Sequence, residues 1–328
     1  MSPIRSLVTT LAAGAMTAVS SLVPAAHAAG THSLVILPDQ KESALYAFVN
    51  SARKSVDVTI YELRDTTLVN DLVKKEKAGV KVRVVFDAQH ADVDGAAYKA
   101  LSAAGAGVTY SSPAYVYTHQ KTITVDGATS YISTGNFDSK YYATSRDYGV
   151  FDRDAADVRA IEKVFAADYA KKPVTPSDAT DLVWSPTDSQ RRLLALIKSA
   201  RHSLDVQQEE FGDTTLVNAL VAEARRGVAV RVVAENRSSK YSKQLKKVTA
   251  AGGKVTTYTS STGYYIHAKA IVVDHGTAAA KVFAGSENFS ANSLNHNREL
   301  GIIVSDSAIV GGIEKAFTAD FRKGSGKA

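Results

Sequence analysis

Two histidine motifs carry the clearest chemical signal in the sequence. His119 is followed by Lys121, and His267 is followed by Lys269, so that the second motif repeats the first 148 residues later. Because alternate residues of a strand point to one face, the histidine and lysine of each motif are expected to lie on the same side. A neutral imidazole can attack phosphorus or accept a proton, and an ammonium group can neutralise a phosphate. These pairs therefore suit phosphodiester chemistry.

Further polar residues follow each histidine at matched positions. An aspartate, Asp126 or Asp274, completes an HxKx4D pattern and is expected to bond backbone or turn groups beside the strand. Hydroxyl and amide groups that can donate to phosphate come next, followed by a carboxylate suited to hold the far ring nitrogen of a histidine. These supporting residues are Thr134, Asn136 and Asp147 in the first copy and Ser286, Asn288 and Glu299 in the second.

A purely structural role and a metal site are the alternatives to catalysis for these motifs. A lone histidine beside a lysine on a strand is usually a solvated or packing residue. Two such motifs at equivalent positions, with the same polar companions, favour function over a merely duplicated structural motif. A metal site is disfavoured, because protonated lysine is a poor ligand and no additional histidine or carboxylate stands close by in the sequence. No cofactor is expected.

The repetition extends well beyond the motifs and predicts the architecture. Ala52–Val58 resembles Ala200–Val206, and Asp65–Asn70 recurs unchanged as Asp213–Asn218. A four-residue insertion is expected in the second copy near 275–280, where the spacing between copies changes from 148 to 152 residues. Within each copy, apolar strand segments alternate with amphipathic helical ones. The sequence therefore predicts an α/β fold of two duplicated sandwich domains, with mixed sheets flanked by helices, a pseudo-twofold axis and one shared active site.

The first copy shows the elements that must position the site. Asp65 or Thr66 is expected to cap a helix and Gly79 to end it, since an acidic or hydroxyl side chain suits a helix start and glycine a helix end. Helices are expected at 44–53, 66–77, 93–104 and 155–169, and strands at 56–61 and 80–86.

Length, composition and the N-terminus complete the domain assignment. The 328 residues suffice for about two domains. Zero cysteines exclude a disulfide scaffold, thiolate metal sites and a cysteine nucleophile, and the net charge of +6 permits an anionic partner without identifying one. Arg5, an apolar stretch and the tripeptide ending at Ala28 predict a signal peptide and a secreted protein. The expected domains are 1–28 (signal peptide), 29–172 (first repeat) and 173–328 (second repeat).

These motifs resemble the phospholipase D superfamily, whose mark is two HxKx4D motifs, each followed by GSxN. The second copy resembles the family closely through Gly285, Ser286 and Asn288. The first copy departs at Ser133-Thr134, where the family usually has Gly-Ser, and at Asp147, where glutamate is commoner. The resemblance covers nearly the whole mature chain.

The resemblance implies a metal-independent two-step transfer through a phosphohistidine intermediate. Family habit favours His119 as the nucleophile and His267 as the general acid and base, while the sequence itself does not order the two. No obligatory protein partner is expected, and the chain is expected to act as a monomer. The candidate catalytic set is His119, Lys121, Asp126, His267, Lys269 and Asp274.

The substrate is less sharply defined by the sequence. Cardiolipin synthases of the usual kind are membrane-anchored, and no segment after the N-terminal stretch could cross a bilayer, so the sequence disfavours that activity. The favoured hypothesis is a secreted phospholipase D that hydrolyses phospholipid head groups, also transferring phosphatidyl to alcohols at a membrane surface. Tyrosines near both motifs suit a lipid interface, and Glu62 and Glu210, at equivalent strand ends, could attract a cationic head group. The alternative is a secreted nuclease, for which Arg225, Arg226 and the lysines of 240–247 supply a basic face.

Overall fold

The computed structural model describes residues 30–176, 181–259, 263–324 and 326–327. The chain divides into residues 1–30 and a compact unit, Thr31–Ala328, which contains both sequence repeats. The predicted signal peptide, 1–28, lies outside the described residues and stays a prediction. None of the helices in the described ranges combines the length and the apolar character needed to span a bilayer.

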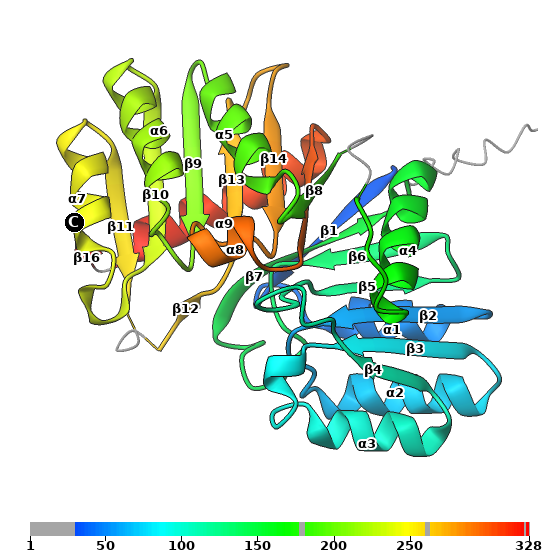
Figure 1. The fold of residues 1–328 in the computed structure, drawn as a ribbon. Coiled ribbons are helices and arrows are strands. Elements are labelled where there is room, and N and C mark those ends of the chain that lie inside the picture. Colours follow the sequence, from blue (N-terminus) through cyan, green and yellow to red (C-terminus); the bar gives the residue numbers. More distant parts are fainter. Residues whose placement is uncertain (1–29, 177–180, 260–262, 325, 328) are drawn as a thin grey trace, which may run out of the picture. The chain divides into compact units, whose positions relative to one another are not determined.

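Within the described residues, two eight-stranded sheets repeat one strand order (Figure 1). The first runs β1-β7-β6-β5-β2-β3-β4, and the second runs β8-β15-β14-β13-β9-β10-β11 with β16 beyond β11. The order is the same when each strand is matched to its counterpart in the other repeat. β2 pairs with β3 in parallel and with β5 in antiparallel orientation. β9 pairs in the same way with β10 and β13, so both sheets are mixed, as predicted.

The strand bounds are as follows. The first sheet contains β1 (His32–Leu37), β2 (Ser55–Ile60), β3 (Lys81–Phe86), β4 (Gly107–Tyr110), β5 (Thr122–Val125), β6 (Thr129–Ser133), β7 (Ser145–Asp152) and, beside β7, β12 (Tyr265–Ile266). The second sheet contains β8 (Leu182–Ser185), β9 (Ser203–Gln208), β10 (Ala229–Glu235), β11 (Lys254–Tyr258), β13 (Ala270–Val273), β14 (Lys281–Gly285), β15 (Glu299–Val304) and β16 (Gly326–Lys327).

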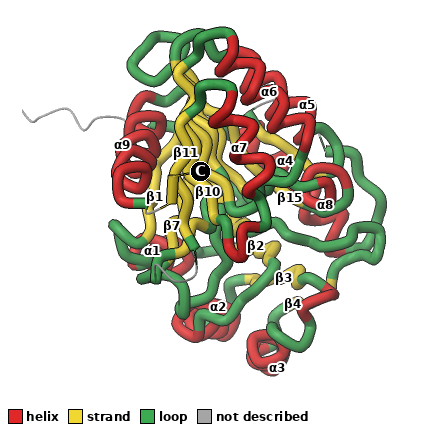
Figure 2. Tube along the Cα trace, turned by 90° about the vertical axis from the view of Figure 1, so that its left-hand side faces the viewer, coloured by secondary structure: helices red, strands yellow, loops and turns green. Residues whose placement is uncertain are grey.

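Helices cover both faces of each sheet. In the second repeat, α9 lies on one face of the strands while α5, α6 and α7 lie on the other (Figure 2). In the first repeat, α1, α2 and α3 pack on one face and α4 on the other. The helices are α1 (Ser43–Ser51), α2 (Thr66–Lys77), α3 (Gly95–Ala104), α4 (Ala155–Tyr169), α5 (Ser189–Ser199), α6 (Thr214–Arg225), α7 (Ser242–Ala250), α8 (Ala291–Asn295) and α9 (Ser307–Lys323), with short 3-10 turns at Ala88–His90 and Arg237–Ser239.

Local sequence signals explain where these elements begin and end. Asp65 caps α2, because its side chain accepts hydrogen bonds from the backbone N–H groups of Thr67 and Leu68. Gly79 follows the end of the helix with φ of +86°, a left-handed conformation that glycine adopts without steric cost. The hairpin after β13 spans seven residues against three after β5, which confirms the four-residue insertion. The predicted fold class is therefore confirmed.

A central apolar core joins the two repeats. Ile132 and Val150 of the first sheet belong to the same buried cluster as Ala284 and Ile302 of the second, together with apolar residues of α4 and α9. Burial of each large apolar side chain contributes roughly 1.5–3 kcal/mol. This core brings β6 and β7 against β14 and β15, so the polar strand ends of the two repeats face one another.

The last helix before the predicted domain boundary ends at Tyr169, and the next strand begins at Leu182.

Candidate active site

Residues of both repeats line one cavity of about 560 Å³. Both motif histidines lie in its wall, and so do both asparagines and both late carboxylates predicted to support them. Tyrosines and further carboxylates complete much of the remaining wall. The predicted site residues found in the lining are His119, Asn136, Asp147, His267, Asn288 and Glu299.

Each histidine is held by a carboxylate of the other repeat. His119 Nδ1 lies 2.7 Å from Glu299 Oε2, and His267 Nδ1 lies 2.8 Å from Asp147 Oδ1. A carboxylate at Nδ1 favours the tautomer with the proton on that nitrogen, and leaves Nε2 for chemistry. The sequence identified Asp147 and Glu299 as residues that could hold a histidine, but not that the pairs cross between repeats.

Strand pairing across the repeats produces these crossed pairs. β12 of the second repeat runs parallel to β7 of the first, with Ile266 opposite Arg146, so the following residues are His267 and Asp147. On the other side, Thr118 forms a parallel bridge with Arg298, which brings His119 beside Glu299. The backbone N–H groups of His119 and Gln120 both donate to Arg298 O. Main-chain hydrogen bonds therefore fix the position of both rings.

Burial and the neighbouring charges set the protonation of these groups. Burial lowers the pKa of His119 below its ordinary value, although Glu299 acts in the opposite direction. Burial would raise the pKa of Asp147, but His267 and Lys269 outweigh it, and the pKa lies below the usual value. The pKa of Glu299 is lowered in the same way, by His119 and Lys121 against the effect of burial. Both carboxylates are thus held as anions.

The two motif lysines lie beneath the cavity and have different partners. Lys121 is 1% exposed and donates to His119 O, with its Nζ 4.9 Å from the ring centre of Tyr61. Burial lowers the pKa of Lys121 to about 7. Lys269 is fully buried, and its Nζ lies 2.8 Å from Glu209 Oε2. Between residues 30 and 324, wherever the chain is described, carboxylate oxygens within 4.0 Å are found for Lys269 but not for Lys121.

The family is shown by comparison with known proteins. A family model described as cardiolipin synthase, PLD-like domain, matches residues 45–169 and 193–321. This chain belongs to the phospholipase D superfamily. The resemblance inferred from the two HxKx4D motifs is confirmed, and so is the broader prediction of an enzyme that works on phosphodiesters.

Individual relatives refine this result. A cardiolipin synthase of Oceanobacillus iheyensis is 23% identical over 329 residues, which cover 86% of this chain and 67% of that protein. Two solved structures share the fold. Polyphosphate kinase of Porphyromonas gingivalis has a TM-score of 0.71 at 16% identity, covering 89% of this chain and 47% of that one. Phosphatidylserine synthase of Haemophilus influenzae has a TM-score of 0.67 at 11% identity, covering 91% and 87%. The chain thus spans about two thirds of the first relative and about half of the kinase.

These relatives correct the predicted activity. The sequence favoured a secreted phospholipase D that hydrolyses head groups and also transfers phosphatidyl to alcohols, with a secreted nuclease as the alternative. The assignments as a hydrolase and as a nuclease were both wrong, and secretion stays a prediction. The sequence relatives are named as cardiolipin synthases, and one of the two similar structures is a phosphatidylserine synthase. The error lay in disfavouring cardiolipin synthase for want of a membrane anchor. The phospholipase D-type site is built entirely from residues between Tyr61 and Glu299, so a membrane anchor says nothing about its chemistry.

The third residue of each phospholipase D motif lies away from the cavity. Asp126 follows β5 with φ of 56°, and its carboxylate accepts from the backbone N–H groups of residues 53–55 at 2.7–3.1 Å. Asp274 has φ of 50° and binds the N–H groups of residues 201–203 in the same way. The six motif residues therefore do not form a single catalytic cluster. Each aspartate ties the hairpin to the start of β2 or β9, which is the structural role expected for it.

Two residues expected to bind phosphate do not point into the cavity. Thr134 Oγ1 donates to Asp147 Oδ1 at 2.7 Å and accepts from Tyr148 N. Ser286 Oγ accepts from Leu300 N at 3.1 Å. Both hydroxyls therefore bond the neighbouring strand, β7 or β15. Thr134 therefore orients the carboxylate that holds His267, which corrects its predicted role as a phosphate ligand. Ser286 bonds the backbone of Leu300 and is not a phosphate ligand in this structure either.

Glu209 is the site residue that sequence reasoning missed. Its Oε2 lies 2.8 Å from Lys269 Nζ and 3.6 Å from His267 Nε2, and it accepts from Asn288 Nδ2 at 3.3 Å. The predicted strand-end carboxylate, Glu210, instead pairs with Lys240 at 3.4 Å. The sequence does show Glu209, directly before the predicted residue Glu210. Glu209 was overlooked because the first repeat has a tyrosine, not an acid, at the matching position.

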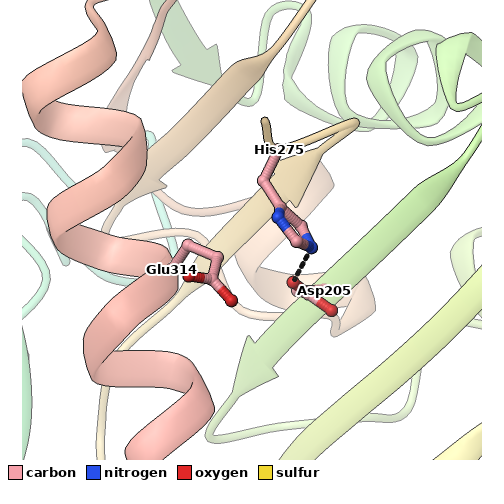
Figure 3. A group of neighbouring side chains, drawn as sticks. All are labelled: Asp205, His275 and Glu314. Atoms are coloured by element: carbon pink, nitrogen blue, oxygen red, sulfur yellow. Dashed lines mark ion pairs between the residues drawn. The ribbon is translucent and has the colours of Figure 1, made fainter. Parts of the chain in front are cut away.

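A separate group of side chains has the composition of a metal site. Asp205 of β9, His275 after β13 and Glu314 of α9 face one another, with ligand atoms within 4.8 Å (Figure 3). However, the Arg231 guanidinium already contacts both acids, with two nitrogens 2.6 Å from Asp205 oxygens and one nitrogen 3.1 Å from Glu314. A cation would have to displace this bidentate pair. The group is therefore an ion-pair cluster, and none of its members lines the phospholipase D cavity.

Proposed function

We propose that this chain is a phosphatidyltransferase, which moves a phosphatidyl group from a phospholipid to the hydroxyl of an alcohol acceptor. The observation that carries the proposal is the pair of crossed contacts, His119 to Glu299 and His267 to Asp147, around one cavity. Two oriented imidazoles at one site suit a double displacement at phosphorus. The names of the relatives supply the lipid class.

The first step forms a covalent intermediate. His119 Nε2 attacks the phosphorus of the donor lipid through its lone pair, and a phosphorus–nitrogen bond forms as the bond to the head-group oxygen breaks. His267 Nε2 gives its proton to that leaving oxygen. The assignment of His119 as nucleophile is supported by its lowered pKa, which burial causes and which keeps the ring neutral.

The second step regenerates the protein. The acceptor hydroxyl gives its proton to His267, its oxygen attacks phosphorus, and the phosphorus–nitrogen bond to His119 breaks. Charge on the phosphoryl oxygens is stabilised by Lys121, Lys269 and the amides of Asn136 and Asn288. The acceptor alcohol binds in the cavity of about 560 Å³, where it takes the place of water.

The rim of the cavity supports a lipid at a membrane surface. Tyr117 and Tyr265 line the cavity, as do Tyr141 and other aromatic side chains. Tyr141 is 38% exposed at the cavity. Val116 is 44% exposed and lines a neighbouring hollow that shares Tyr117 with the cavity, and these two are the exposed large hydrophobic side chains among the described residues. Apolar and amphipathic groups at the mouth of a site suit the interface of a bilayer. Two of the tyrosines that precede the motif histidines in the sequence lie elsewhere, since Tyr115 binds Arg298 and Tyr264 lines a separate hollow.

The test is transfer by the purified chain on lipid vesicles. Phosphatidylglycerol vesicles with EDTA should yield a lipid with two phosphatidyl groups on one glycerol, detected by mass spectrometry together with released glycerol. His119→Ala and His267→Ala should each lower the rate at least 10⁴-fold, as loss of a nucleophile or a general acid does. A product in which only water has accepted the phosphatidyl group would contradict the proposal, and so would full activity in either variant.

A further inference from the structure

The two repeats differ at the position that faces the second histidine. Glu209 matches Tyr61 in the repeat alignment, 148 residues apart. Tyr61 packs its ring edge-on against His119, with 4.5 Å between ring centres, and Lys121 lies against the same ring. Glu209 instead places a carboxylate 3.6 Å from His267 Nε2 and 2.8 Å from Lys269. One histidine thus faces an aromatic ring where the other faces an anion.

This difference gives the two imidazoles different surroundings. His267 has a carboxylate at each ring nitrogen, Asp147 at Nδ1 and Glu209 at Nε2. For His119, the described residues supply a carboxylate within 4.0 Å at Nδ1 alone. An imidazole between two anions is stabilised in its doubly protonated, cationic form. An imidazole with one anion at Nδ1 keeps a free lone pair on Nε2, which is the form a nucleophile needs.

We infer that Glu209 assigns the two catalytic roles: its carboxylate, which faces His267 Nε2, favours that ring as the proton donor, while His119 attacks phosphorus. The inference rests on the proposed transferase function and deepens it. At 3.6 Å, the Glu209 oxygen lies beyond hydrogen-bond distance from Nε2. It therefore stabilises the charge of the imidazolium without taking the proton, which stays available for the leaving oxygen. Glu209 acts through His267 and is a positioning residue.

The contacts of Glu209 keep it anionic and in place. Burial would raise its pKa, but Lys269 and His267 hold the pKa well below its usual value. Tyr265 donates to the other carboxylate oxygen, and Asn288 donates to the oxygen that faces His267. The carboxylate is thus fixed by groups on three sides, as a pre-organised electrostatic contact requires.

A competing role for Glu209 is to neutralise the buried Lys269 and nothing more. The two roles differ in how they depend on the leaving group. If Glu209 only neutralises Lys269, its loss changes the binding of the phosphate group, and the rate should fall equally for every leaving group. Proton donation matters for an alkoxide leaving group and hardly at all for p-nitrophenolate, which departs without a proton.

The experiment compares two donor lipids in a single turnover of the full chain. One donor is phosphatidylglycerol and the other is the p-nitrophenyl ester of the same phosphatidic acid, both in mixed micelles. Glu209→Gln keeps the shape and removes the charge. It should slow glycerol release about 10²-fold and p-nitrophenolate release less than about 3-fold, because general acid catalysis contributes about 10²–10⁴-fold. Glu209→Asp, which restores the charge, should recover much of the rate of glycerol release.

Glu210→Gln is the matched control, since it removes one charge from the neighbouring residue of the same cavity wall. It should leave the ratio of the two release rates as in the parent chain. Equal losses for both donors in Glu209→Gln, or no loss for either, would overturn the inference. If that variant fails to fold by circular dichroism, the double variant Glu209→Gln with Lys269→Met removes both buried charges. Compared with Lys269→Met alone, it must show the same selective loss. A parent chain that releases neither leaving group would instead refute the proposed function.

Discussion

The two halves of the active site share a scaffold but not a set of charges. Asp126 and Asp274 bind three consecutive backbone N–H groups with almost the same distances, and both hairpins turn at the same point. The groups around the histidines differ, because Tyr61 lies where the second half has Glu209. After duplication, the parts that hold the strands together kept their geometry. The parts that face the cavity became unequal, as two chemical roles require.

A second difference shows how the halves accommodate their carboxylates. A side chain at Gly135 would place its Cβ 2.6 Å from Cγ of Asp147, so glycine leaves room for that residue. The matching position of the second repeat holds Glu287, which is fully buried, and burial raises its pKa well above the usual value. A Cβ on Gly285 or Gly301 would lie 2.5 or 2.7 Å from the Glu287 carboxyl group. The glycines of the two halves thus make room for different acids.

The largest effect is expected from the crossed carboxylates. Glu299→Gln and Asp147→Asn remove the charge that orients His119 and His267 respectively, and each should lower kcat for transfer about 10²–10⁴-fold, because the ring tautomer and orientation are lost. The variants should differ in the intermediate. Asp147→Asn should still label His119 with phosphorus from a p-nitrophenyl donor, whereas Glu299→Gln should label it poorly. Intact-protein mass spectrometry after acid-free quenching measures this, and equal labelling would remove the functional distinction between the halves.

Much of the fold was predictable because it depends on local and repeated signals. Asp65, Gly79 and the strand segments recur with constant spacing, so the duplication, the mixed sheets and the helix ends followed from the sequence. The two histidines were recognisable because their motifs coincide in both copies. Signals that agree between repeats reinforce one another.

Contacts between the repeats were not predictable in the same way. Which carboxylate holds which histidine depends on β12 pairing with β7, and two residues of strand are too short to leave a periodic pattern. Glu209 was overlooked because a comparison of the two repeats selects residues that are identical in both, whereas the first repeat has Tyr61 at the position of Glu209. Thr134 was assigned to phosphate because a sequence shows a hydroxyl group but not its direction.

A smaller effect, equal in both halves, is expected from the motif aspartates. Asp126→Ala and Asp274→Ala each leave three backbone N–H groups without their acceptor and should lower the free energy of unfolding by about 1–3 kcal/mol. Burial opposes the lowered pKa of both aspartates, but the backbone donors outweigh it. Their contribution is therefore present above the unfolded pKa and is lost as pH falls through the lower folded pKa. Urea unfolding at neutral and acidic pH measures this. A loss confined to one half would show that the scaffolds are not equivalent.

Anion binding should depend on pH through the first half of the site. Because burial lowers the pKa of Lys121 to about 7, raising the pH through that value removes its charge in the free protein. Its charged neighbours are Glu299, Lys269, Glu209 and Glu62. Sulfate, which keeps a constant charge in this range, should bind about 10-fold more weakly at about pH 8.5 than at about pH 6. Calorimetric titration of Lys121→Met should show a flatter profile, whereas Lys269→Met should keep the dependence. A pH profile that is unchanged in Lys121→Met would contradict the lowered pKa.

The smallest effect is expected at the exposed apolar side chains in and beside the cavity, where the halves contribute different surfaces. Val116 and Tyr141 belong to the first repeat and are the large hydrophobic side chains exposed among the described residues. Val116→Ser with Tyr141→Ser should lower transfer on vesicles about 3- to 10-fold, because each exposed apolar side chain contributes roughly 1 kcal/mol or less at an interface. A short-chain monomeric phospholipid should be turned over at the parent rate, since neither side chain contacts the histidines. An equal loss on both substrates would place these residues in the cavity chemistry rather than at the membrane. No loss on vesicles would show that the first repeat does not supply the lipid-facing rim.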